Sequence, residues 1–247
     1  MDPGRPHAHA RHRAAREDPG GVAAVLTRID HVAIGVADLK AGIAAYRRIG
    51  FEVDDLGVGR NDGDRLRLVT PGDGLKSIAL ASNNLAADSA AVRARGTAQY
   101  LTLVAPKNGQ AASPHPNGVQ RIERVYIAVR DIAAAAAMYS LVLGVPKPKM
   151  ERGTVINADM AIFQFGPTAL GLAQPCAPGV CADALARRGP GPFQILYRTS
   201  SMDAAAKWMS DHGVPPPARG IRNTGEQAML VAPEHACGVY IGFVGPA

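Results

Sequence analysis

Two side chains that could do chemistry stand in otherwise apolar stretches of the chain. His31 opens the stretch HVAIGV, and Arg124 precedes VYIAV. An imidazole can hold a metal ion or move a proton near neutral pH, whereas a guanidinium stays charged and recognises carboxylate or enolate oxygens. Structural explanations compete with both roles. A neutral imidazole is satisfied beside a carbonyl, and the arginine is equally explained by an ion pair with Glu123, Asp159 or Glu226.

A possible zinc site lies further along the chain. Its candidate ligands are Cys176, Cys181, His235 and Cys237, but C-x4-C and H-x-C are not the tight spacings that make zinc motifs specific. We therefore interpret these residues as buried or incidental thiols and an unrelated histidine. Three cysteines, an odd number, argue against a disulfide framework and predict a reducing compartment, with cytoplasm as the expected location.

Composition excludes several classes of function. The chain is 47% hydrophobic and 19% charged, as in an ordinary globular protein, and has no apolar run of about 18 residues that would span a membrane. The net charge is +6, but aromatics are only 5% and the cations are scattered, which disfavours nucleic-acid binding. Residues 1–27 are basic, lack the apolar run of a secretory signal and predict a disordered tail. The expected partner is a small molecule, and a homodimer is possible.

One pattern of residues occurs four times along the chain. A strand-like run is followed by a polar N-cap, an apolar residue, and a glycine eleven or twelve residues later, as expected for a helix that begins and ends there. The apolar residue and glycine are Leu39 and Gly50, Leu85 and Gly96, Ile132 and Gly144, and Met202 and Gly213. A strand of the form apolar-x-apolar-x-x-Pro then ends at Pro71, Pro106, Pro175 and Pro246. The two signatures predict four strand–helix–strands modules.

The repeated unit resembles the βαβββ module of the vicinal oxygen chelate superfamily, also called the glyoxalase/bleomycin-resistance/dioxygenase superfamily. IDHVAIGVADLKAGIAAYRRIGF is its most family-like part, and HPNG at residues 115–118 resembles two-domain glyoxalase-like members. The resemblance implies an α+β fold. Four modules, some abbreviated, pair into two cup-shaped mixed and mostly antiparallel sheets with helices outside. We expect a first glyoxalase-like domain at residues 28–106, a linker at 107–120 and a second domain at 121–247.

Strand alternation then predicts which residues face each cup. In the first strand Val32, Ile34 and Val36 should pack on the helices, while His31 faces the cup. The corresponding first-strand positions of the other modules are Ser77, Arg124 and Gln194. Tyr126 shares the face of Arg124. The central residues of the four proline-terminated strands, also expected to face the cups, are Arg67, Thr102, Gly171 and Gly242.

The resemblance also implies where a metal ion would bind. Metal-binding relatives carry His or Gln at the first-strand position and Glu at the last-strand position. Of these expected positions, only His31 is a strong ligand here, and Arg124 would repel a cation. We therefore expect no cofactor. A divalent metal held through atypical ligands, such as His31 with His115 of the linker, remains an alternative.

The leading functional hypothesis is an enzyme, of lyase or isomerase type, acting on a small oxygenated organic molecule. It would transfer a proton next to a carbonyl, with His31 as base and an arginine stabilising the oxyanion. The catalytic candidates are His31, Arg124, Tyr126 and His115. The candidate substrate contacts are Arg67, Ser77, Thr102, Asn117, Gln194, Gly171 and Gly242.

Some of these assignments have specific competing readings. His115 and Asn117 would form either a tight turn or a lid at the mouth between the cups, and the two glycines would leave room for a ligand. Two other functions remain open for the whole chain. One is a metal-free protein that sequesters a small molecule, as the bleomycin-resistance relatives do. The other is a metal-dependent lyase or dioxygenase with atypical ligands.

Overall fold

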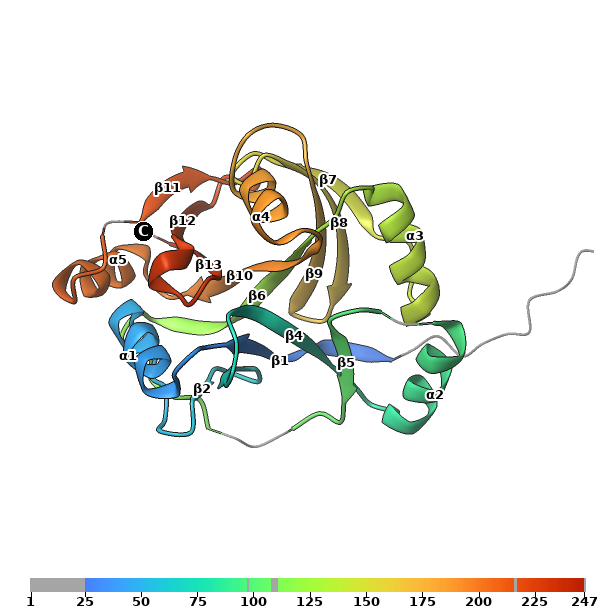
Figure 1. Ribbon diagram of the computed structural model, residues 1–247, viewed down its shortest axis with the longest axis horizontal. Coiled ribbons are helices and arrows are strands. Elements are labelled where there is room, and N and C mark those ends of the chain that lie inside the picture. Colours follow the sequence, from blue (N-terminus) through green and yellow to red (C-terminus); the bar gives the residue numbers. More distant parts are fainter. Residues whose placement is uncertain (1–24, 97, 108–110, 216, 247) are drawn as a thin grey trace, which may run out of the picture.

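Two curled sheets packed back to back form the protein (Figure 1). The computed structural model describes residues 25–96, 98–107, 111–215 and 217–246. The first sheet has the order β2-β3-β1-β4-β5. Its strands are β1 (Leu26–Gly35), β2 (Val58–Arg60), β3 (Arg65–Val69), β4 (Gly74–Ser82) and β5 (Leu101–Val104). The predicted tail lies outside the described residues up to position 24, and its last two residues belong to β1.

The second sheet is larger, with the order β11-β12-β13-β10-β6-β9-β8-β7. Its strands are β6 (Val119–Ala128), β7 (Lys149–Gly153), β8 (Ala158–Phe165), β9 (Thr168–Pro175), β10 (Gly191–Thr199), β11 (Ala218–Ile221), β12 (Gln227–Val231) and β13 (Tyr240–Gly245). A short 3-10 helix, η1 (Pro233–His235), precedes β13. Because β6 begins at Val119, the predicted linker ends two residues before position 120.

The module pattern is confirmed strand by strand. In each module the first strand pairs in parallel with the proline-terminated strand: β1 with β3, β4 with β5, β6 with β9, and β10 with β13. The second module is abbreviated, because β5 alone follows its helix before the linker. The first sheet therefore has five strands where the second has eight.

Four helices begin where the repeat predicts: α1 (Leu39–Ile49), α2 (Leu85–Arg95), α3 (Ile132–Leu143) and α5 (Met202–Asp211). The side chains of Asp38, Asp131 and Ser201 accept hydrogen bonds from backbone N–H groups in the first turn, as N-caps should. Asn84 precedes its helix without making such a bond. A fifth helix, α4 (Val180–Arg188), lies between β9 and β10 and was not predicted. None of the helices in the described residues is long and apolar enough to cross a membrane.

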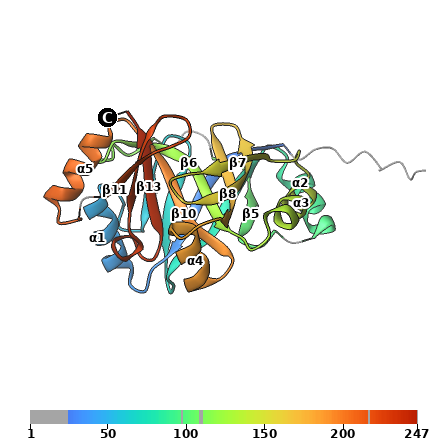
Figure 2. The same cartoon turned by 90° about the horizontal axis from the view of Figure 1, so that it is seen from above.

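The main core lies between the two sheets. Val32 and Ile34 of β1 belong to the same buried cluster as Val125 and Ile127 of β6, so these faces pack on the opposite sheet as well as on helices. The prediction that these residues pack on the helices is therefore incomplete. The helices close the ends of the shared core instead, α1 with α5 at one end and α2 with α3 at the other (Figure 2). The concave face of each sheet consequently points away from the other sheet.

Candidate functional site

The concave face of the second sheet holds a pocket of about 610 Å³, counting open solvent at its mouth. Apolar side chains from four strands line it, namely Tyr126, Met160, Leu196 and Ala228. Residues 152–156, from the end of β7 and the β7–β8 turn, and residues 222–224, from the β11–β12 turn, also line it. β7 and β11 are the two edge strands of the sheet, and the sheet curls until these edges meet. Thr154 Oγ1 donates to Asn223 Oδ1 at 3.0 Å across this junction.

A β-bulge in β6 directs two charged side chains toward the concave face. Arg124 lies opposite Leu196, and Ile122 lies opposite Tyr197, so Glu123 is an extra residue in the ladder. A bulge of this kind re-aims side chains next to a site. The same irregularity occurs in β1, where Asp30 is the extra residue before His31. Sequence alternation alone does not reveal either bulge.

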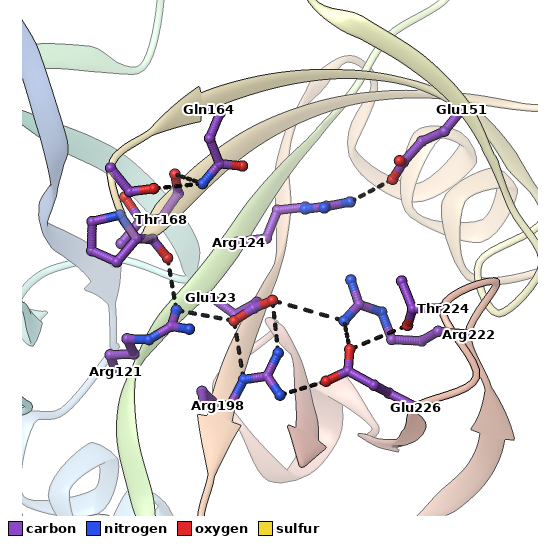
Figure 3. Close-up of polar contacts among 12 residues, drawn as sticks. Arg121, Glu123, Arg124, Glu151, Gln164, Thr168, Arg198, Arg222, Thr224 and Glu226 are labelled. Atoms are coloured by element: carbon purple, nitrogen blue, oxygen red, sulfur yellow. Dashed lines mark hydrogen bonds and ion pairs between the residues drawn. The ribbon is translucent and has the colours of Figure 1, made fainter.

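Arg124 is held by a carboxylate that the sequence did not identify. Its Nη1 donates to Glu151 Oε1 at 2.8 Å (Figure 3). The same Nη1 donates to the Tyr126 hydroxyl at 3.2 Å. Burial works against the charge of Arg124, but Tyr126 and Glu151 outweigh burial and raise its pKa. The expected partners Glu123, Asp159 and Glu226 are therefore wrong.

Those three carboxylates pair with other arginines. Glu123 accepts hydrogen bonds from Arg198 and lies 3.8 Å from Arg222, and Glu226 pairs with both arginines (Figure 3). Asp159 pairs with Arg152 at 3.1 Å. Each arginine that lines the pocket, Arg124, Arg152 and Arg222, thus has a carboxylate partner.

Two buried polar atoms of the pocket residues have no partner among the described residues. They are the Nε of Arg124 and the Oε1 of Gln194, whose side chain comes from β10 beside Tyr126 and is 3% exposed. Buried donors and acceptors in native proteins are nearly always satisfied, by protein or by something bound. Both atoms are also shielded from solvent, so they belong to an unsatisfied part of the pocket wall and are not exposed to the cavity.

The two glycines do not leave open space for a ligand, contrary to our expectation. A Cβ on Gly171 would lie 2.7 Å from Tyr126 Cδ1, and one on Gly242 would lie 2.7 Å from Leu196 Cδ1. The missing side chains make room for Tyr126 and Leu196 themselves. The two glycines therefore allow the lining side chains of Tyr126 and Leu196 to pack closely against the sheet.

The other end of the concave face is filled by α4. Cys181 is fully buried, and its thiol lies 3.5 Å from the Ala173 carbonyl oxygen. Ala184 of the same helix belongs to a buried cluster with Ala128 and Phe193. Burial raises the pKa of the Cys181 thiol to about 12, which keeps it protonated. Gly179 and Gly189, which flank α4 in the sequence, are the pattern that could have predicted this helix.

His31 lies on the concave face of the first sheet, away from Arg124. Its Nδ1 lies 2.7 Å from the Oδ1 of Asp30, which is 2% exposed and also pairs with Arg65. Burial acts to raise the pKa of Asp30, but the hydrogen bonds and charges of His31 and Arg65 together outweigh burial and lower that pKa. The back-to-back packing places His31 and Arg124 on the concave faces of different sheets, so these two residues do not share one site.

The other residues expected in the first cup share the face of His31. Ala33 lies opposite both Arg67 and Ser77, and Ala79 lies opposite Thr102. Arg67 and Thr102 are exposed to solvent. Because the second module ends after β5, this sheet lacks the further strands that curl around the pocket of the second sheet. Its concave face is open at these residues.

His115 and Asn117 do not form a lid. Glu52 N–H donates to His115 Nδ1 at 2.9 Å, so the ring proton sits on Nε2, which lies 2.8 Å from Asn61 Oδ1. Asn117 is fully buried, donates to the Ile49 carbonyl and accepts from Val119 N–H. Both side chains fix the linker to the first sheet. His115 has no nitrogen free for catalysis or for sharing a metal with His31.

The buried His115 predicts a measurable pH dependence of stability. Burial lowers the pKa of His115 to about 4 and raises that of Asp64, which accepts from Asn61 in the same cluster, to about 7. Between about pH 4 and 6.5, unfolding takes up a proton at His115, so the unfolding free energy rises with pH. Unfolding releases a proton at Asp64 over the same range, which has the opposite effect.

We expect His115→Gln to remove the first contribution. Across this interval its unfolding free energy should decrease with rising pH relative to the unmodified protein, and Asp64→Asn should shift the slope the other way. Urea denaturation at several pH values measures these slopes. Equal slopes for the three proteins would contradict the assignment.

The donor set does not fit a divalent cation in the pocket. In this pocket the positions that hold metal ligands in metal-binding members of the superfamily are Arg124, Gln194, Gly171 and Gly242. Of these side chains, only that of Gln194 has an atom that could coordinate a cation. The described residues contain no group of three or more His, Cys, Asp or Glu side chains arranged to hold a metal, including the Cys176–Cys237 set. We predict well under one metal ion per chain by elemental analysis of untagged protein lacking residues 1–24. A stoichiometric transition metal would contradict this prediction.

Comparison with known proteins gives one family and one fold. Residues 123–232 match the model described as Glyoxalase/Bleomycin resistance protein/Dioxygenase superfamily. No curated protein matches the chain. A triple mutant of 4-hydroxymandelate synthase from Streptomyces coelicolor is 13% identical and matches 89% of this chain and 92% of that chain, with a TM-score of 0.67. This likeness is one of fold, and it extends over both sheets.

Two shorter solved structures resemble about half of the chain. Methylmalonyl-CoA epimerase from Mycobacterium tuberculosis is 26% identical over 57% of this chain and 94% of its own, with a TM-score of 0.49. A variant of the Streptomyces coelicolor epimerase in complex with 2-nitronate-propionyl-CoA is 25% identical over 52% of this chain and 99% of its own, with a TM-score of 0.45.

Proposed function

Because the chain belongs to the vicinal oxygen chelate superfamily, we propose that the pocket of its second sheet binds a small oxygenated organic molecule. The observation that carries the proposal is the concave pocket itself, where an apolar lining surrounds the Arg124–Glu151 pair and Gln194. An apolar concavity with a few convergent polar groups is the usual form of a small-molecule site.

A pocket-blocking variant tests this proposal. Val155 is a half-buried lining residue on the β7–β8 turn, and Val155→Trp should fill part of the space. Leu56→Trp, at a position 79% exposed and outside the pocket, is the matched control. Small oxygenated fragments detected by ligand-observed NMR should bind to the unmodified protein and the control, and lose binding to Val155→Trp. Equal binding to all three proteins would place the ligand site elsewhere.

For the reaction, we propose proton transfer next to a carbonyl, of lyase or isomerase type. Glu151 is the one carboxylate among the residues that line the pocket, so it replaces His31 as the proposed base. When Glu151 takes a proton from carbon, negative charge moves to the substrate oxygen, where Arg124 can stabilise it. The Arg124–Glu151 pair has no net charge before the transfer. The negative charge then moves from the Glu151 carboxylate to the substrate oxygen, and in both positions it lies beside the Arg124 guanidinium. Stabilisation of charge that develops only in the transition state is what accelerates such a step.

Sequestration without turnover is the second candidate. It is favoured by the pairing of Glu151 with Arg124 at 2.8 Å, because a carboxylate oxygen that accepts from a guanidinium is already occupied. Tight stoichiometric binding of a carbonyl ligand without any exchange of its protons would support it.

A further inference from the structure

Two cations on the concave face of the first sheet have no acidic partner. Arg67 of β3 and Lys76 of β4 are exposed, and neither forms an ion pair or a hydrogen bond with any residue that the structure describes. The charged groups around them are paired with one another, Arg60 with Asp54, Arg65 with Asp30 and Arg188 with Asp73. Within the described part of the chain, this face therefore carries two positive charges that no carboxylate offsets.

A bulge and two glycines position Lys76 on this face. Lys76 is an extra residue in β4, between the residues that pair with Ala33 and Ile34 of β1. A Cβ on Gly35 would lie 2.5 Å from Lys76 Cε, and a Cβ on Gly72 would lie 2.8 Å from the same atom. Gly35 shares the concave face with Ala33, because the two residues are two positions apart in β1. The lysine side chain therefore runs through space that the glycines leave open, and its charged end lies close to Ala33.

Ala33 forms a floor between polar side chains from three strands. Arg67 of β3 and Ser77 of β4 lie opposite Ala33 on its two sides, on strands whose backbones are about 4.8 Å from its own. His31 precedes Ala33 by two residues on the same face, and its Nδ1 lies 2.7 Å from Asp30 Oδ1. His31 Nε2 and Ser77 Oγ have no partner among the described residues, and both remain accessible to solvent. Because Ala33 is also partly exposed, a ligand above it can reach these polar atoms.

We propose that the concave face of the first sheet binds a phosphate group above Ala33, between Arg67 and Lys76. This site is separate from the pocket of the second sheet and does not depend on the function proposed for that pocket. A phosphate monoester carries a charge of about −2 at neutral pH and three strong acceptor oxygens. Its charge matches the two unpaired cations, and its oxygens can accept from donors on three strands.

A carboxylate matches this arrangement less well than a phosphate does. It carries one negative charge, and its two oxygens lie in one plane, where a single arginine can satisfy both. Lys76 and Ser77, on the opposite side of Ala33 from Arg67, would then gain little from the ligand. The position of the donors on both sides of the floor therefore favours a phosphate.

Titrations of the full-length protein with inorganic phosphate, phenyl phosphate and benzoate test the proposal. Two-dimensional ¹H–¹⁵N NMR at constant ionic strength should show saturable shifts of the Ala33 and Ser77 amide signals with both phosphates, and none with added chloride. Benzoate presents a carboxylate on the same ring and should bind at least about 10-fold more weakly than phenyl phosphate, as expected for one lost charge-assisted hydrogen bond. Tighter binding of phenyl phosphate than of inorganic phosphate would identify a phosphorylated organic molecule as the ligand, and the reverse order would identify the free anion. Either order supports the site.

Paired charge variants locate the binding. Arg67→Gln/Lys76→Gln removes both unpaired charges and should weaken the binding of phenyl phosphate by at least about 10-fold. Both positions are exposed, so the melting temperature should stay the same. Lys40→Gln/Arg93→Gln, at exposed positions of α1 and α2, lowers the net charge by the same amount and should leave the affinity unchanged.

Three results would overturn the proposal. Equal weakening in the two double variants would show a response to net charge alone, and undiminished binding to Arg67→Gln/Lys76→Gln would place the phosphate elsewhere on the chain. Equal affinities for benzoate and phenyl phosphate would remove the selection for phosphate. Val155→Trp, which blocks the pocket of the second sheet, should not change phosphate binding, so this proposal and the proposed function of that pocket fail or succeed separately.

Discussion

Glu151→Gln is expected to slow proton exchange on a bound carbonyl ligand by about 100- to 10,000-fold, the usual contribution of a general base. Glutamine keeps the shape of the side chain and an oxygen that can accept from Arg124, but it cannot take a proton from carbon. Deuterium incorporation next to the carbonyl of neutral ketones such as α-tetralone, followed by NMR in D₂O, measures the rate. Ligand affinity should change little, because the acceptor toward Arg124 remains.

The matched control is Asp159→Asn. Asp159 also pairs with an arginine, Arg152, but it is not among the residues that line the pocket. It should leave the exchange rate unchanged. Exchange that persists in Glu151→Gln would remove Glu151 as the base, while loss of ligand binding in that variant would assign it a binding role instead. Absence of exchange in the unmodified protein, with ligands bound, would favour sequestration.

Phe51→Ala is expected to lower the free energy of unfolding by about 3–5 kcal/mol, the typical cost of removing a buried aromatic ring. Phe51 is 1% exposed and follows α1, yet its ring centroid lies 4.9 Å from that of Tyr197 and 6.1 Å from that of Phe243, both in the second sheet. The loss should therefore affect both sheets together. Phe51→Leu, which retains more of the buried volume, should lose less.

Two probes can follow this unfolding in urea. Trp208, the single tryptophan, donates from Nε1 to the Arg47 carbonyl and reports on the α1–α5 end of the core, while circular dichroism reports on the whole chain. The two signals should change at one midpoint in the unmodified protein and in Phe51→Ala. Two separate transitions, only one of them shifted, would show that the predicted domains at residues 28–106 and 121–247 unfold independently despite the shared core. Leu56→Ala, at an exposed position, is the neutral control.

The strands of the first two modules form one sheet, and those of the last two modules form the other. A shared buried core joins the two sheets. The positions that face the second pocket, Arg124, Tyr126 and Gln194, were derived from strand alternation and do line it. Their catalytic and binding roles remain proposals.

The sequence by itself determined the modules, because their signals are local. Asp38, Asp131 and Ser201 cap helices through N–H groups three residues away, and Gly50 and Gly144 adopt the left-handed backbone that ends a helix. Alternation along a single strand likewise placed Val125 and Tyr126 on opposite faces. Each of these inferences uses neighbours within about one helical turn or a few strand residues.

Only the tertiary structure decided what meets at the site. Glu151 reaches Arg124 from 27 residues away, and Asn223 reaches Thr154 across 69, because the eight-stranded sheet curls until its edges touch. The β6 bulge re-aims Glu123, α4 fills the other end of the concave face, and packing turns His31 away from Arg124. Such contacts depend on sheet curvature and on which surfaces are buried together, neither of which is written in local residue spacing.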